Sequence, residues 1–166
     1  MKLKEKNIAI DFDDSLRVKK FDDRSHGLSH CMKAVDFIVE DDKKVFFIEF
    51  KDPDHPGAKE EDREKFLEKF KSAKIDEELK YKYRDSFLYE YAAGNLSEKP
   101  IIYLIMINAK ALSPAALLAK NDTLKKTLPV GKPIDSWIKP IVHSCLVISF
   151  QTWNRQFANM QLSMVV

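Results

Sequence analysis

The 166-residue chain has little glycine, little cysteine and no long apolar run. Four glycines and seven prolines exclude collagen-like and low-complexity designs. The two cysteines, Cys31 and Cys145, lie far apart and outside any CxxC pair, which excludes a disulfide framework and a cysteine-rich zinc site. The longest apolar run, residues 101–107, is too short to cross a bilayer. These absences favour one globular domain over residues 1–166, with no membrane partner.

Charge is distributed unevenly along the chain. Residues 99–166 carry eight basic and two acidic side chains, whereas residues 1–98 carry twenty basic and twenty-four acidic ones. This asymmetry is compatible with metal-binding carboxylates in the first part and a polyanion-binding surface in the second. If the partner is nucleic acid, several of the lysines of this part should border the cleft that holds the carboxylates: Lys110, Lys120, Lys125, Lys126, Lys132 and Lys139. The basic N-terminus is not followed by the apolar segment of a signal peptide, so we expect a cytoplasmic protein.

The first half of the chain contains four strand-like segments. Segments 34–40 and 44–51 are rich in Val, Ile and Phe and predict a hairpin, with Asp41-Asp42 as a two-residue turn. Segments 7–12 and 16–21 predict an earlier hairpin closed by residues 13–15.

The second half alternates between helix and strand patterns. Residues 59–93 predict one long helix, or two helices broken near residues 75–76, and residues 101–108 a buried strand. A helix from residue 113 to about 126 and a strand over 141–150 follow, and then a short helix or irregular tail over 152–161. The order predicts an α/β fold with a mixed central sheet flanked by helices.

Glu49 and Lys51 end an otherwise apolar strand, and alternation along the strand sends both to one face. The two-residue turn would place Asp36 opposite Phe47, on that same face and diagonal to Glu49, at roughly 7–8 Å between backbones. Two carboxylates beside a lysine can hold Mg²⁺ or Mn²⁺ and activate water. We therefore expect the three side chains in one cleft, and we expect Glu49→Gln to fold well because it relieves carboxylate repulsion.

The pattern of Asp36, twelve residues, then Glu49-Phe50-Lys51 resembles the PD-(D/E)XK nuclease superfamily. The resemblance implies a restriction-endonuclease-like fold and metal-dependent hydrolysis of nucleic-acid phosphodiester bonds, with DNA favoured over RNA. It implies that Asp36, Glu49 and the Phe50 carbonyl bind Mg²⁺ or Mn²⁺, and that Lys51 is the catalytic lysine together with the two acids. Val35 stands where the family name has proline, and residues 59–93 lack the glutamine found in some members. Because no separate recognition domain is evident, we expect a homodimer or a partner protein.

Other interpretations of the sequence remain open. The chain can be a non-catalytic member of the same fold that serves binding or assembly, which metal binding at Asp36 and Glu49 would distinguish. Glu49 and Lys51 can also form a simple salt bridge on an edge strand. Residues 8–16, IAIDFDDSL, resemble the first motif of haloacid-dehalogenase-like phosphatases, with Asp11 as nucleophile and Asp13 as general acid. The test is whether Asp11 or Glu49 lies in the pocket.

Overall fold

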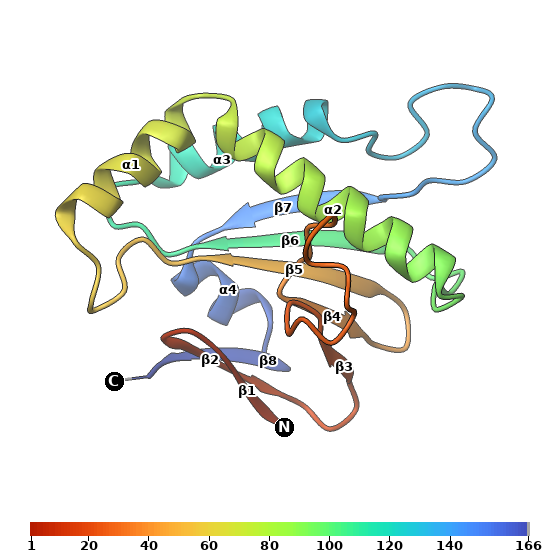
Figure 1. Ribbon diagram of the computed structural model, residues 1–166, viewed down its shortest axis with the longest axis horizontal. Coiled ribbons are helices and arrows are strands. Elements are labelled where there is room, and N and C mark those ends of the chain that lie inside the picture. The colour runs from red at the N-terminus through yellow and green to blue at the C-terminus, as the bar shows by residue number, and fades with distance from the viewer. Residues whose placement is uncertain (166) are drawn as a thin grey trace.

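A computed structural model describes residues 1–165 as eight strands and four helices (Figure 1). The elements in chain order are β1 (Lys2–Glu5), β2 (Ile8–Phe12), β3 (Arg17–Lys20), β4 (Phe37–Glu40), β5 (Val45–Lys51), α1 (Glu60–Lys71), α2 (Lys74–Ala92), β6 (Ile101–Ile107), α3 (Pro114–Thr127), β7 (Ser144–Ile148), α4 (Phe150–Gln156) and β8 (Met160–Met164). Within residues 1–165, no helix is both long and apolar enough to span a membrane.

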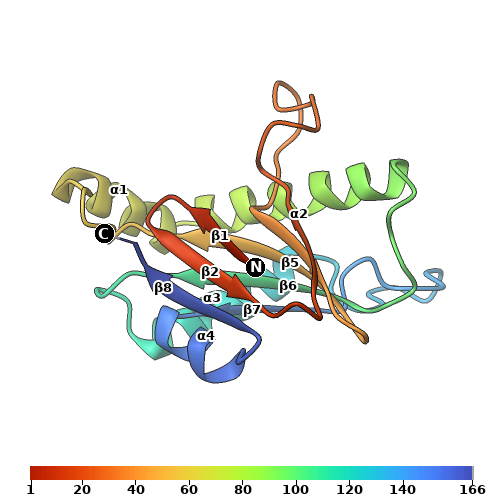
Figure 2. The same ribbon diagram turned by 90° about the horizontal axis from the view of Figure 1, so that it is seen from below.

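A five-stranded sheet in the order β3-β4-β5-β6-β7 forms the centre of the molecule. Strands β3, β4 and β5 pair antiparallel, and β5, β6 and β7 pair parallel, so the sheet is mixed as predicted. Helices α1, α2 and α3 cover one face of this sheet (Figure 1). The second sheet, β1-β2-β8, and helix α4 lie against the other face (Figures 1 and 2).

Alternation along β5 divides the core into two layers. Val45 and Phe47 pack toward the helices, whereas Phe46, Ile48 and Phe50 pack toward the second sheet. Because both faces are covered, β5 and β6 are apolar almost throughout. Any charged side chain on the helix-covered face of β5 is therefore buried and needs a partner.

The predicted hairpin of segments 7–12 and 16–21 is wrong. Strand β2 pairs with β1 and β8, and β3 pairs with β4 in the other sheet. The apolar side chains of β2 pack in the same core layer as Trp153 of α4 and Met160 of β8. Strand β8, which pairs with β2, comes from the far end of the chain. Residues 13–16 thus link two sheets instead of closing a hairpin.

The hairpin of β4 and β5 is present, but its two-residue turn is not. Residues 41–44 form the connection, and the Asp41 carboxylate accepts hydrogen bonds from the backbone N–H groups of Lys43 and Lys44 at 2.7 and 2.6 Å. The ladder pairs Phe37 with Ile48, a slip of two residues from the prediction. Because side chains alternate with period two, the slip keeps Asp36 on the expected face and moves it level with Glu49.

The helical region and the C-terminal part are close to the prediction. Residues 59–93 form two helices, which break at Ser72-Ala73. The Ser113 side chain caps α3 by accepting from the Ala116 N–H at 3.1 Å, as the Ser-Pro pair predicts. The predicted strand over 141–150 is shorter, and the tail forms both α4 and β8.

Candidate functional site

Asp36, Glu49 and Lys51 line one cavity of about 420 Å³ at the end of β5, which helices α1 and α2 and the β1–β2 turn also line. The predicted placement of these three residues is therefore confirmed, and their roles stay predictions. Phe50 also lines the cavity. The charged or titratable side chains that complete the lining are Glu5, Lys6, Asp22, Asp52, His55, Asp62 and Lys82.

Glu49 is the most deeply buried charge of the cavity, with 1% of its surface exposed. Its Oε1 lies 3.0 Å from the Lys51 Nζ and 2.8 Å from the Lys82 Nζ, and its Oε2 accepts from Lys82 at 3.0 Å. Strand β5 is central in its sheet, so these contacts are not a salt bridge on an exposed edge. Two ammonium groups offset the cost of burying the carboxylate.

Asp36 lies at the start of β4, where its side chain continues the hydrogen bonding of the sheet. Its Oδ2 accepts the Phe50 backbone N–H at 2.6 Å. Burial raises the pKa of Asp36 well above its usual range, the nearby Glu49 charge raises it further, and Lys82 and the Phe50 N–H oppose the shift only in part. The Asp36 carboxyl therefore favours its neutral form more than an exposed aspartate does.

Lys82 of α2 is the site residue that sequence reasoning missed. Burial lowers its pKa, but the charges of Glu49 and Asp36 outweigh burial, so the pKa of Lys82 is raised overall and its ammonium is stabilised. A signal for it does exist in the sequence: Lys82 lies seven residues after Ile75 and three after Leu79, both apolar. A lysine at that spacing shares their side of the helix, which faces the sheet.

Two buried polar atoms beside Lys51 have no hydrogen-bond partner among residues 1–165. They are Asp52 Oδ2 and His55 Nδ1, and both residues line the cavity. Asp52 Oδ1, in contrast, accepts from Asn108 at 2.7 Å. The loop after β5 therefore carries an acceptor oxygen and a ring nitrogen that are buried at the cavity wall without a protein partner.

The predicted metal ligands fit a cation only together with water or substrate oxygens. Among residues 1–165, no group of three or more His, Cys, Asp or Glu side chains is arranged to hold a metal ion. Mg²⁺, however, commonly uses one or two carboxylates and takes its other ligands from water and phosphate. Asp36 and Glu49 supply two carboxylates, and ammonium groups already contact both oxygens of Glu49.

The expected basic border of the cleft is not found. None of the six lysines of the second half, all in the described part of the chain, lines the cavity. Lys120 instead lies 7% exposed between α2 and α3, where its ammonium is 2.6 Å from Asp76. The lining has six carboxylates against three lysines and is formally acidic.

The competing motifs lie elsewhere. Asp11, the nucleophile of the phosphatase interpretation, is exposed on β2, 3.9 Å from the N-terminal amine, and Glu49 is the residue in the cavity. His26 stacks on Phe21, and its Nδ1 accepts the Leu28 N–H. The geometry thus selects Glu49 over Asp11.

No family model, curated protein or solved structure matches the chain. The side chains of the cavity are accordingly the basis for inferring its chemistry.

Proposed function

We propose that the protein is a metal-dependent nuclease of the PD-(D/E)XK type, with a restriction-endonuclease-like fold, that hydrolyses phosphodiester bonds of nucleic acid, DNA more readily than RNA. The observation that carries the proposal is the convergence of Asp36, Glu49 and Lys51 in one cavity, at the end of a buried hairpin. A buried acid pair beside a lysine costs stability, and such costs are typical of functional sites. We place this activity in the cytoplasm, with a homodimer or a partner protein completing recognition.

Asp36 and Glu49 are the residues that would hold Mg²⁺ or Mn²⁺, with the Phe50 carbonyl facing the ion. When bound, the cation activates water and neutralises charge that develops on the phosphate. Lys51 orients the attacking water by hydrogen bonding and stabilises negative charge on a phosphate oxygen. Lys82 keeps Glu49 neutralised before loading. If Glu49 held a cation, the Lys82 ammonium would be able to contact the phosphate.

The test is cleavage of single- and double-stranded DNA and RNA by the purified protein. Cleavage should require Mg²⁺ or Mn²⁺, stop on chelation and be lost in Glu49→Gln and Lys51→Ala. The matched controls Glu64→Gln and Lys43→Ala change exposed residues and should cleave like the wild type. Cleavage that survives in the two site variants would assign the activity to a contaminant or to another site.

A non-catalytic binding or assembly module is the second candidate, because both Glu49 oxygens are already engaged by lysines. In that case the charges are a structural network. Calorimetric titration with Mn²⁺ distinguishes the two. Binding that disappears in Glu49→Gln supports the nuclease, whereas a wild type that neither binds Mn²⁺ nor cleaves supports the module.

A further inference from the structure

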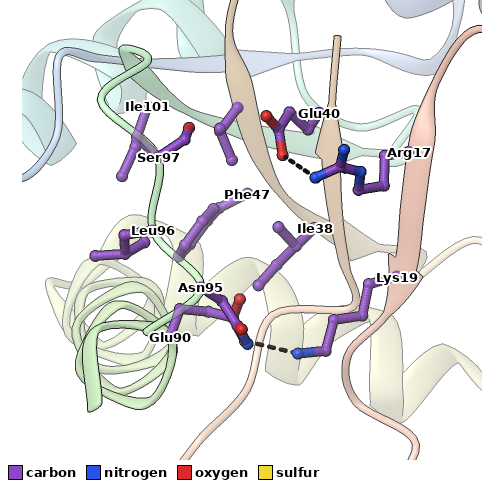
Figure 3. Close-up of a pocket in the computed structure, with 11 residues that line it drawn as sticks. Arg17, Lys19, Ile38, Glu40, Phe47, Glu90, Asn95, Leu96, Ser97 and Ile101 are labelled. Carbon is purple, nitrogen blue, oxygen red and sulfur yellow. Dashed lines mark hydrogen bonds and ion pairs between the residues drawn. The ribbon is translucent and has the colours of Figure 1, made fainter. Parts of the chain in front are cut away.

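A second cavity, of about 300 Å³, lies beside the same central sheet, near the C-terminal end of α2 (Figure 3). Glu90 at this cavity and Lys82 at the first are eight positions apart on α2, about 12 Å along the helix axis. Apolar side chains of β4, β5 and β6 line its middle, among them Ile38, Phe47 and Ile101. Charged side chains stand at its two ends (Figure 3).

Glu90 gives this cavity an acceptor that the protein does not use fully. Its side chain is only 6% exposed, and it accepts from Lys19 at 2.7 Å and from Asn95 at 3.4 Å. Both hydrogen bonds go to Oε1, so Oε2 keeps its acceptor capacity. Lys19 is held in place over the rings of Phe21 and Tyr89, at 4.9 and 5.6 Å from their centres.

At the opposite end of the cavity, the carboxylate already has two charged partners. Glu40 there binds Arg17 at 3.4 Å and Lys99 at 2.7 Å. The charged groups of the lining, Arg17 and Lys19 against Glu40 and Glu90, balance one another. A ligand without net charge in the part that enters is therefore favoured. The cavity has the size of the smallest ligand pockets, which begin at about 300 Å³.

We propose that this cavity binds a nucleobase, and guanine in preference to the others. A base has apolar faces that suit the aliphatic side chains of the lining, such as Leu96 and Ile101, and a polar edge that proteins read by hydrogen bonds. Guanine presents two neighbouring N–H groups that can donate to the unused Glu90 Oε2, beside a carbonyl that accepts from Lys19. Adenine has no carbonyl, and its edge offers a single amino group. The site is separate from Asp36 and Glu49 and does not depend on the proposed cleavage.

The experiment is a titration of the ¹⁵N-labelled full chain with the four ribonucleoside 5′-monophosphates, without metal ions. Guanosine monophosphate should bind at least tenfold more tightly than adenosine monophosphate. The amide signals of Ile38, Glu90, Asn95 and Leu96 should shift. Inorganic phosphate should not reproduce these shifts. Equal affinity for all four nucleotides, or shifts that map elsewhere, would overturn the proposal.

Two variants locate the base. Glu90→Gln should lose at least tenfold in affinity for guanosine monophosphate, whereas Glu98→Gln, an exposed glutamate of the following loop, should bind like the wild type. Ser97 is exposed at the lining of the cavity, so Ser97→Trp should block binding without disturbing the core. Unchanged binding in Ser97→Trp would refute the site even if Glu90→Gln does not fold.

The base can belong to a free nucleotide or to a nucleic-acid strand. A thymidine oligonucleotide with one central guanine, titrated beside its all-thymidine counterpart, separates these sources. Guanine-dependent binding of the strand, with the same amide shifts, supports an unpaired base as the natural ligand. Binding of the mononucleotide alone supports a free nucleotide. Failure of both overturns the guanine site and leaves the nuclease proposal standing.

Discussion

Replacing Lys82 with methionine tests whether this lysine holds Glu49. The change keeps an unbranched side chain of similar length and removes one of the two ammonium groups that contact the buried carboxylate. A hydrogen bond to a charged group contributes about 1.5–3 kcal/mol. Lys51 remains 3.0 Å from Glu49, so the carboxylate is not left alone. We therefore expect the free energy of unfolding to fall by about 2 kcal/mol, less than the roughly 3–5 kcal/mol for an unpaired buried charge.

Urea denaturation at pH 7 measures this loss. Lys74→Met removes an exposed lysine of the same helix and should change stability by no more than about 0.5 kcal/mol. A double-mutant cycle with Glu49→Gln isolates the pair: Lys82→Met should cost less once the Glu49 charge is gone, with a coupling energy of about 1–2 kcal/mol. Equal losses for Lys82→Met and Lys74→Met, or a coupling energy near zero, would refute the role assigned to Lys82.

Two further predictions concern other buried charges. Asp36→Asn should be more stable than the wild type at pH 7, because burial raises the pKa of Asp36 and its ionised form opposes folding, while asparagine still accepts the Phe50 N–H. This advantage should shrink as the pH falls and vanish only well below pH 3.8, the ordinary pKa of aspartate, where Asp36 is protonated in the unfolded chain as well; an advantage that urea titrations find independent of pH would contradict it. Asp76→Ala should cost about 3–5 kcal/mol because it leaves the Lys120 ammonium buried without its partner. The same denaturation assay should find exposed Asp122→Ala within about 0.5 kcal/mol of the wild type.

The predicted shared face of Asp36, Glu49 and Lys51 is correct although the predicted turn is wrong, because side chains alternate along a strand. The turn determines which residues of β4 and β5 face each other, and the two-residue turn was wrong. Side chains of one strand alternate between faces, so only an odd slip would have moved Asp36 away from Glu49 and Lys51. Local alternation therefore predicted the shared face, although the residue opposite Asp36 was misassigned.

Contacts between distant parts of the chain were beyond the same reasoning. Strand β1, Lys-Leu-Lys-Glu, has no apolar alternation of its own and forms through its pairing with β2. Strand β2 is held in turn by β8, about 150 residues away. Lys82 follows Glu49 by 33 residues, and the helix face that meets the sheet depends on tertiary packing. Without Lys82, the sequence placed only Lys51 and the repelling Asp36 carboxylate beside Glu49, so Glu49→Gln was expected to fold well. Two ammonium groups at Glu49 reverse that expectation.

The formal charge of the cavity has different consequences for the two proposed functions, the nuclease and the non-catalytic module. Six carboxylates and three lysines repel a phosphodiester, even with Asp36 protonated. A module that binds nucleic acid without metal would need the lysines of the second half at this surface, and they lie elsewhere. A cation at Glu49 would add positive charge to the cavity and would compete with Lys51 and Lys82 for the carboxylate. The acidic lining therefore favours nucleic acid as a substrate that binds together with a metal ion over nucleic acid as a ligand of the metal-free cavity. A module that binds no metal would be expected to use this cavity for a ligand other than a polyanion.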